Sequence, residues 1–506
     1  MPDELERLAN AVLWPGFLGS TVPGWLADAL RDGLAGVVLF AQNLGGGTAA
    51  LSADIHRLAP QALIGIDEEG GSVTRLETAT GSTIPGAAEL GALDDVEATR
   101  AAGFEIGRRV DAIGADVVLA PVADVNTDPR NPVIGVRAFG SDTALVSRHV
   151  AAAVRGIQSA GVAACAKHYP GHGDTHTDSH HDLPRITLSQ DEIERVHLPP
   201  FTAAIDAGVH AIMTAHIAAQ HWGDAPATLD PVVLGRLRAG FDGVIITDAL
   251  DMAAIRESVG IGGGAVRALA AGADLLCVGN PTNPGAAMRP DQDERDYREA
   301  RDAVVAAIRS GELPRARVEE AARRVAAMAA TVRARGEVAG VPFDADAIAD
   351  RALRIDGAFA PFDDAPTTVI DLRRASSLAV DSAGSHVALA LAAGGRVVRL
   401  DADRAAGAEI EAAILAAGEC QSVVLVDRID ADAAQRAVLD RIRSAVPGTV
   451  AVNVGLAVPD PGPTVTASAA SLLAARAARR ALLNPPADSA RERAGTAAEA
   501  TEEEPS

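Results

Sequence analysis

Eight short apolar runs, separated by helical patterns, dominate the first 280 residues of this 506-residue chain. Each run is continuously apolar rather than alternating, which is typical of parallel strands buried on both faces. Eight strand–helix units of this size fit a (β/α)8 barrel, and a doubly wound open sheet is the alternative. The runs are Val12–Phe17, Gly36–Phe40, Ala62–Asp67, Val117–Asp124, Ala163–Pro170, Ala211–His216, Gly243–Asp248 and Leu275–Gly279.

Five of these runs end in side chains that can do chemistry. In a barrel the carboxyl ends of all strands converge on one mouth, where active sites are built, whereas in an open sheet they spread along an edge. The convergence favours the α/β, TIM-like barrel and predicts a site at its mouth. The residues concerned are Asp67, Asp124, the pair Lys167 and His168, His216 and Asp248.

The residue composition and the pattern of apolar residues divide the chain into four parts. We predict a catalytic barrel domain over 1–335, a linker rich in Gly, Pro and Asp breaks over 336–364, and a smaller α/β layered, αβα sandwich-like domain over 365–485. The polar and acidic tail, 486–506, is predicted to be disordered. Strand candidates of the smaller domain are Thr367–Asp371, His386–Leu391, Val397–Asp401, Ser422–Asp427 and Thr449–Val454.

Composition excludes several classes of protein. The chain has 45 basic and 68 acidic residues, a net charge of −23, which argues against nucleic-acid binding. No apolar run approaches the roughly 20 residues of a membrane span, and the acidic start does not resemble a secretory signal. The three cysteines are far apart and suggest no disulfide framework. We therefore expect a soluble, cytoplasmic monomer without nucleic-acid or membrane partners.

The segment 167–184 has the highest density of side chains that can act in acid–base chemistry or bind a metal. It holds the single lysine of the chain, Lys167, and five of the twelve histidines. Three interpretations are open: a polar surface loop, a zinc site, or an acid–base pair. The His and Asp spacings match no common zinc arrangement, so no metal and no cofactor are predicted. Asp178 and His180, two residues apart in an extended loop, can place a carboxylate beside an imidazole, which fixes its tautomer and raises its basicity.

Four spaced motifs together resemble the bacterial β-N-acetylhexosaminidases of glycoside hydrolase family 3. The first is the His-rich segment, with Lys-His-Tyr-Pro-Gly-His-Gly, then Asp-Ser-His and Leu-Pro. The other three are Ile-Asp-Glu-Glu-Gly-Gly-Ser-Val-Thr-Arg at 66–75, Asn-Pro-Val-Ile-Gly-Val-Arg-Ala-Phe-Gly at 131–140, and Gly-Val-Ile-Ile-Thr-Asp-Ala-Leu-Asp-Met at 243–252. The resemblance covers about residues 10–335. The smaller domain resembles the C-terminal layered domain of the family more weakly.

The resemblance implies a retaining glycosidase. Asp248 would be the nucleophile of a covalent glycosyl-enzyme, with Asp251 as its rival in the same stretch. His180, oriented by Asp178, would be the general acid and base, which departs from the usual pair of carboxylates. The substrates implied are terminal β-linked N-acetylglucosaminides, including cell-wall muropeptide fragments, and the role implied is recycling.

The same resemblance implies which residues hold the sugar: Asp67, Arg137, Lys167 and His168. Asp67 can accept hydrogen bonds from two hydroxyls, whereas Lys167 and Arg137 can only donate. His216 is open to two interpretations, a sugar contact or a core histidine with its hydrogen bonds satisfied.

Three other functions are open. Within the family, a phosphorylase would pass the glycosyl group to phosphate, and a histidine, unlike a carboxylate, does not repel that anion. A Schiff-base aldolase would explain Lys167 but leaves Asp248 and the Asp178–His180 pair unused. A sugar-binding barrel without chemistry is the non-enzymatic alternative.

Overall fold

The computed structural model describes residues 3–175, 184–219, 221–334, 340–374 and 383–485. The chain divides into two compact units. The first comprises Met1–Glu69, Val73–Thr78 and Asp94–Phe343, and the second Gly70–Ser72, Ala79–Leu93 and Asp344–Ser506. The predicted tail lies outside the described residues. No helix in the described part of the chain is both long and apolar enough to cross a membrane.

The first unit is built on parallel strands, as the continuous apolar runs predict. Six strands form one sheet in the order β2-β3-β4-β5-β7-β9, and β1 pairs in parallel with β10. A parallel bridge between Ile246 and Leu275 joins β9 to β10. These strands are β1 (Leu13–Pro15), β2 (Gly36–Leu39), β3 (Leu63–Ile66), β4 (Val117–Val118), β5 (Ala163–Tyr169), β7 (Ala211–Thr214), β9 (Val244–Ile246) and β10 (Leu276–Gly279).

The strand pairing forms a curled parallel sheet, but among the described residues it does not close that sheet into a barrel. Among the described residues no strand ladder joins β1 to β2, although Ala35 N donates to Asn10 O at 2.9 Å beside these strands. The predicted closed (β/α)8 barrel is therefore not established by the hydrogen bonding. A second short parallel pair, β6 (Arg185–Ile186) with β8 (Ala218–Ala219), lies outside the main sheet.

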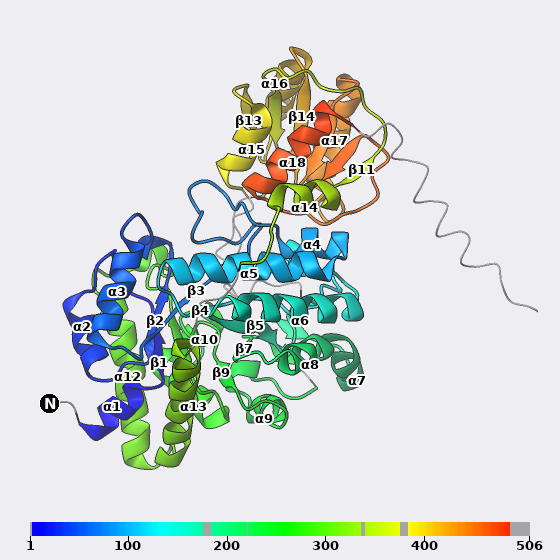
Figure 1. Cartoon of the computed structure of the whole chain (residues 1–506). Coiled ribbons are helices and arrows are strands. Elements are labelled where there is room, and N and C mark those ends of the chain that lie inside the picture. Colours follow the sequence, from blue (N-terminus) through cyan, green and yellow to red (C-terminus); the bar gives the residue numbers. More distant parts are fainter. Residues whose placement is uncertain (1–2, 176–183, 220, 335–339, 375–382, 486–506) are drawn as a thin grey trace, which may run out of the picture. The chain divides into compact units, whose positions relative to one another are not determined.

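Helices follow most of the strands of the first unit. Figure 1 shows α5 and α6 lying side by side, and a Cβ on Gly156 would meet Arg100 O at 2.2 Å, so the two backbones approach closely. The helices are α1 (Glu4–Asn10), α2 (Gly24–Arg31), α3 (Thr48–Leu58), α5 (Val96–Ala112), α6 (Thr143–Ser159), α7 (Gln190–Glu192), α8 (Pro199–Asp206), α9 (Pro231–Arg238), α10 (Ala253–Arg256), α11 (Gly260–Ala271), α12 (Gln292–Ser310) and α13 (Arg315–Arg333), with short turns η1 (Ala41–Asn43), η2 (Gly135–Arg137), η3 (Ile193–His197), η4 (Ala227–Leu229) and η5 (Gly285–Ala287).

One apolar cluster fills the inside of the curled sheet. Alternate residues of the strands contribute to it, and α13 adds Val325, Met328 and Val332. Trp14 is its largest member and donates from Nε1 to Leu63 O at 2.7 Å. A Cβ on Gly65 would lie 2.2 Å from the Trp14 ring, so this glycine makes room for the indole.

Asp274 anchors α13 beneath this core. Its side chain is fully buried and accepts from Arg317 Nη2 at 2.8 Å, from Arg324 Nη1 at 3.4 Å, from Arg238 and from the backbone of Ile245. These partners come from α13, α9 and β9, so a single carboxylate joins three elements.

We expect Asp274→Ala to lower the free energy of unfolding by about 3 kcal/mol, because it leaves partly buried guanidinium groups without their anion. Urea denaturation measures the loss. Asp302→Ala is the matched control, because Asp302 is exposed and its ion pair in the described part of the chain is with the neighbouring Arg301, and it should cost less than about 0.5 kcal/mol. Equal losses would show that the Asp274 cluster contributes no more than a surface pair.

The second unit is a three-layer αβα arrangement around a mixed sheet. The strand order is β11-β16-β15-β14-β12-β13, and only β11 runs antiparallel to its neighbour. Its elements are α4 (Ala87–Leu93), α14 (Ala345–Ala352), β11 (Arg354–Asp356), β12 (Thr368–Asp371), α15 (Ser385–Ala392), β13 (Val397–Arg399), α16 (Gly407–Gly418), β14 (Ser422–Val426), α17 (Ala433–Ala445), β15 (Val450–Asn453), β16 (Thr464–Thr466) and α18 (Leu472–Leu483).

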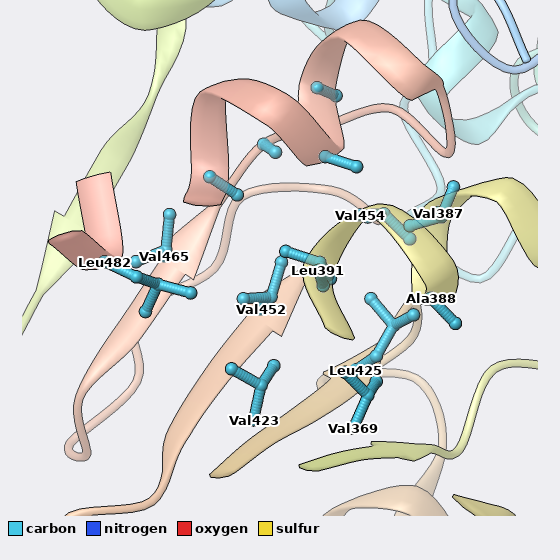
Figure 2. Packing of buried hydrophobic residues seen from close by; sticks show 14 of the residues in the cluster. Val369, Val387, Ala388, Leu391, Val423, Leu425, Val452, Val454, Val465 and Leu482 are labelled. Atoms are coloured by element: carbon cyan, nitrogen blue, oxygen red, sulfur yellow. The ribbon is translucent and has the colours of Figure 1, made fainter. Parts of the chain in front are cut away.

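The two faces of this sheet carry separate cores. Val369, Val423 and Leu425 face α15 and α18, as Figure 2 shows, whereas their neighbours Ile370 and Val424 face α16 and α17. The central strands β12, β14 and β15 are thus apolar on both sides, which explains their continuous apolar runs.

Two expectations for this region differ from the structure. The strand expected at His386–Leu391 is the helix α15: Val387 and Leu391 are buried while Leu389 is 59% exposed, a helical period that a short apolar run does not reveal. The range expected as a linker, 336–364, contains α14 and β11, and Asp344 caps α14 by accepting from Ala347 N. The prolines and described glycines of this range flank these elements, whereas Asp346 and Asp350 lie within α14 and Asp356 ends β11.

Candidate active site

The strand period brings three of the predicted site residues to one face of the first unit's sheet. Side chains on a strand alternate between its faces, so residues two apart point the same way. Cys165 and Ile246 belong to the inner core, and Lys167 and Asp248 follow them by two positions toward the carboxyl ends. Asp67 follows the core residue Leu63 by four. The inner face is thus apolar in its middle and charged at its carboxyl edge.

An ion network occupies this edge. Lys167 Nζ lies 2.7 Å from Asp67 Oδ1 and 2.7 Å from Glu69 Oε1. Arg137 donates to the same Glu69 through Nε at 2.9 Å and Nη2 at 2.7 Å, and its Nη1 donates to Val133 O. The side chains of Lys167, Arg137 and Glu69 are each less than a tenth exposed, and that of Asp67 is 21% exposed. Arg75 lies at the rim, 3.9 Å from Asp67 Oδ2.

The network keeps all its members charged. Burial alone would raise the pKa of Glu69, but Arg137 and Lys167 lower that pKa well below its usual range. Burial likewise opposes ionisation of Asp67, and Lys167 and Arg75 nevertheless lower its pKa. Burial would lower the pKa of Lys167, yet Asp67 and Glu69 raise it. The ammonium and the carboxylates therefore persist together around neutral pH.

His168 pairs with a buried carboxylate. Its Nδ1 lies 2.8 Å from Asp124 Oδ2, and the other carboxylate oxygen accepts from the backbone of His168 and of His172. Burial opposes ionisation of Asp124, but His168 lowers its pKa, so Asp124 is a carboxylate that accepts from Nδ1–H. Nε2 of His168 is then the atom that can serve a ligand.

His172 has a structural place in the loop. Its Nδ1 lies 2.9 Å from Thr175 Oγ1, and its carbonyl accepts from Asn131 at 2.8 Å. Burial lowers the pKa of His172 to about 4, so the imidazole is neutral at physiological pH. The residue joins the Asn131 turn to the start of the His-rich loop.

Asp248 follows β9 at the same carboxyl edge of the sheet. Its Oδ1 accepts from Ala249 N at 2.8 Å. Burial raises the pKa of the Cys165 thiol to about 12, and the charges of Lys167, Asp67 and Asp248 all act on that thiol. The three predicted residues therefore all act electrostatically on one buried thiol of the inner core.

Asp251, the rival nucleophile, is differently placed. It is 4% exposed, its Oδ2 accepts from Asn283 Nδ2 at 2.5 Å, and its carbonyl accepts from Arg256. A Cβ on Gly279 would lie 1.8 Å from Asp251 Oδ1, so its carboxylate is packed against β10. These contacts are those of a residue that supports the loop.

His216 is fully buried, with Nδ1 3.0 Å from Thr228 Oγ1 and Nε2 2.8 Å from Ala249 O. Asp178 and His180 lie outside the described residues. Within the described part of the chain, no group of three His, Cys, Asp or Glu side chains has the arrangement to hold a metal ion.

Two residues of the site were not singled out from the sequence as binding residues. Glu69 joins Lys167 to Arg137, and Asp124 orients His168. The strand-end position of Asp124 predicted it for the barrel mouth, but not its role as the partner of His168. Glu69 is one of three consecutive acids, and nothing in the sequence distinguishes it from Glu68.

A parallel α/β unit with ionised carboxylates, an ammonium and a guanidinium gathered at its carboxyl edge defines an enzyme class that handles small polar, hydroxyl-rich ligands. The family model described as Glycosyl hydrolase family 3 N terminal domain matches residues 27–328. The chain therefore belongs to glycosyl hydrolase family 3, a family of glycosidases.

Named relatives agree with this assignment. The chain is 37% identical over 279 residues to a beta-hexosaminidase of Xylella fastidiosa (strain M23), covering 53% of this chain and 82% of that protein. It is 35% identical over 267 residues to beta-hexosaminidase A of Pseudoalteromonas piscicida, covering 47% of this chain but only 44% of that protein.

The likeness to one solved structure covers the residues of both units. The family 3 beta-N-acetylglucosaminidase from Paenibacillus sp. str. FPU-7 is 30% identical, with a TM-score of 0.81 that covers 96% of this chain and 98% of that one. The likeness therefore extends over the second unit, beyond the range of the family model.

Proposed function

We propose that the protein is a retaining β-N-acetylhexosaminidase that removes terminal β-linked N-acetylglucosamine. The observation that carries the proposal is the buried Asp67–Lys167–Glu69–Arg137 network beside Asp248. It offers ionised acceptors and donors to sugar hydroxyls next to a carboxylate that can attack. The names of the relatives supply the N-acetylhexosamine specificity.

The reaction we propose has two displacements. Asp248 attacks the anomeric carbon, the bond to the leaving oxygen breaks, and His180, oriented by Asp178, gives that oxygen its proton. In the second step His180 takes a proton from water as the water oxygen attacks the anomeric carbon and releases Asp248. Two inversions at one carbon retain the β configuration.

The sugar would be held by the charged network. Asp67 keeps acceptor capacity on Oδ2, Lys167 has a third N–H beyond the two used by Asp67 and Glu69, and His168 offers Nε2. Donors and acceptors that are already oriented by ion pairs need little reorganisation when the transition state forms.

We also propose that the curled sheet closes between β1 and β2 into the eight-stranded barrel, since the order β2-β3-β4-β5-β7-β9 continues through β10 to β1. The cellular role we propose is the recycling of muropeptide fragments in the cytoplasm. Accumulation of N-acetylglucosaminyl muropeptides in the soluble fraction of a deletion strain tests this role.

The aldolase alternative is disfavoured by the environment of Lys167. A Schiff base needs a neutral amine with a free lone pair, and such lysines have a lowered pKa. The pKa of Lys167 is instead raised by Asp67 and Glu69. An ammonium in two ion pairs is suited to donate hydrogen bonds, not to attack a carbonyl.

The test of the proposed function is to trap the intermediate. A 2-fluoro or similar slow N-acetylglucosaminyl donor should label the protein once, and peptide mapping should find the sugar on Asp248. A label on any other residue overturns the mechanism. Product analysis with and without phosphate then decides the acceptor, because a phosphorylase would release the sugar 1-phosphate.

We expect His180→Gly to slow kcat/KM at least a hundredfold for substrates with a poor leaving group, and far less for an activated aryl glycoside that needs no proton. Steady-state kinetics over a series of leaving groups measures this. His168→Gln is the matched control, because a residue that only holds the sugar should raise KM equally for all leaving groups. A uniform loss in His180→Gly would contradict the assignment of His180.

A further inference from the structure

The contacts of His216 identify which ring nitrogen carries its proton. Nε2 lies 2.8 Å from Ala249 O, and a carbonyl oxygen only accepts, so Nε2 carries the proton. In the neutral ring, Nδ1 is then an acceptor, and it faces the Thr228 hydroxyl at 3.0 Å. His216 is fully buried, so these contacts are shielded from solvent.

Thr228 extends this arrangement into a chain of hydrogen bonds. Its hydroxyl also lies 2.8 Å from Thr214 Oγ1 and can donate to Ala215 O at 3.0 Å. Thr228 has one hydroxyl proton, for which Ala215 O and His216 Nδ1 compete at 3.0 Å each. A neutral His216 requires that proton at Nδ1, and the Thr214 hydroxyl can then donate to Thr228. Thr214 ends β7, and both threonines are fully buried.

The chain ends on the turn that carries Asp248. Ala249 N donates to the Asp248 carboxylate at 2.8 Å, and the next peptide unit is held from two sides. Its carbonyl, Ala249 O, accepts from His216, and its N–H, on Leu250, donates to Cys277 O at 2.9 Å. The turn is thus fixed between β7 and β10.

We infer that His216 and Thr228 are positioning residues that fix the Asp248 turn, and that His216 does not contact the sugar. The inference rests on the proposed function, because it is Asp248 as nucleophile that needs a fixed position. A nucleophile must meet the anomeric carbon within a few tenths of an ångström, and a small displacement costs rate rather than binding. The strand-end position that made His216 a candidate site residue is compatible with this role.

Removing the Thr228 hydroxyl tests the inference. Thr228→Val leaves His216 Nδ1 buried without its donor, so we expect kcat on an aryl N-acetylglucosaminide to fall about tenfold or more, with KM within about twofold. Thr228→Ser restores the hydroxyl and should recover most of kcat. Thr143→Val, which removes a hydroxyl that donates to Val196 O, controls for generic destabilisation and should keep kcat. An unchanged kcat in Thr228→Val, or a raised KM with unchanged kcat, overturns the inference.

A second pair of variants decides the matter if Thr228→Val does not fold. His216→Gln places an amide N–H near the position of Nε2 and can still donate to Ala249 O, whereas the shorter side chain of His216→Asn cannot reach it. We expect the Gln variant to keep at least tenfold more kcat than the Asn variant at similar KM. The reverse order, or equal loss, overturns the inference.

A readout without substrate separates this inference from the proposed function. In protein labelled with 15N, the His216 ring should show the Nε2-protonated tautomer, and Thr228→Val should shift its Nδ1 resonance while Thr143→Val does not. If the wild-type protein turns over no N-acetylglucosaminide, the proposed function fails, and these shifts alone decide the hydrogen-bond chain. An Nδ1-protonated ring in the wild-type protein overturns it.

Discussion

Asp248→Asn is expected to lower kcat on an aryl N-acetylglucosaminide by about 10⁴-fold, equivalent to about 5–6 kcal/mol of transition-state stabilisation. The amide has nearly the shape of the carboxylate and can still accept from Ala249 N, so the turn should persist. What it lacks is the negative charge and the nucleophilic oxygen pair that form the glycosyl-enzyme. Stopped-flow kinetics should show that the burst of released aryl group disappears.

Asp251→Asn is the matched control for this prediction. Asp251 is the other carboxylate of the same stretch, and its contacts with Asn283 and β10 indicate a supporting role. We expect this variant to retain the burst and covalent labelling, with a lowered melting temperature. Loss of labelling in Asp251→Asn with retention in Asp248→Asn would exchange the two roles.

A third variant tests Asp248 by chemical rescue. In Asp248→Gly, azide should take the place of the carboxylate and give the α-glycosyl azide.

Lys167→Arg is expected to lower kcat/KM by about a hundredfold, or about 3 kcal/mol. Lys167 Nζ bonds to Asp67 and Glu69 at 2.7 Å each, and its side chain is 3% exposed. A guanidinium is a wide planar fork that cannot reproduce two short bonds from one point, and the enclosed space leaves no room for its extra atoms. Lysine and arginine both carry a positive charge, so the loss of kcat/KM measures the geometry of the side chain alone.

Arg75→Lys is the control for this exchange. Arg75 faces the same Asp67, but at 3.9 Å and with 21% of its side chain exposed, so it has room to change shape. We expect its kcat/KM to stay within about threefold of wild type. A Lys167→Arg enzyme with near-normal kcat/KM would mean that the single lysine of the chain is incidental to the site.

Strand positions were predictable from the sequence because each is a continuous apolar run that ends in a polar residue. The eight runs of the first unit correspond to β1, β2, β3, β4, β5, β7, β9 and β10. The strand predicted at His386–Leu391 was wrong because a run of five apolar residues after a histidine fits a buried strand and a buried helix equally. Closure of the sheet could not be predicted from runs at all, since it depends on the pairing of β1 with β2.

The candidate site was predictable to the extent that strand ends converge. Lys167, Asp67 and Asp248 stand at the same carboxyl edge because each continues the inner face of its strand, and all three act on the Cys165 thiol. His216 shows the limit of this reasoning. It ends an apolar run like the others, yet both of its ring nitrogens face protein atoms. Nδ1 faces the Thr228 hydroxyl, and Nε2 faces the backbone carbonyl of Ala249.

The three consecutive acids after β3 show what only the tertiary structure decided. The sequence by itself determined that carboxylates stand at this strand end, and that the single lysine stands at another. In the fold Asp67 and Glu69 meet Lys167, and their pKa values are lowered. Glu68 turns instead to the backbone N–H groups of Arg75 and Leu76, and burial raises its pKa to about 7.

The physical reason is that the charge state of a carboxyl group depends on the residues around it. Composition and strand period decide where an acid lies along the chain and on which face. Whether it remains ionised depends on cations that come from other strands, here Lys167 at the end of β5 and Arg137 in η2. Those distances exist only once the sheet has curled, and so the charge state of the site belongs to the tertiary structure.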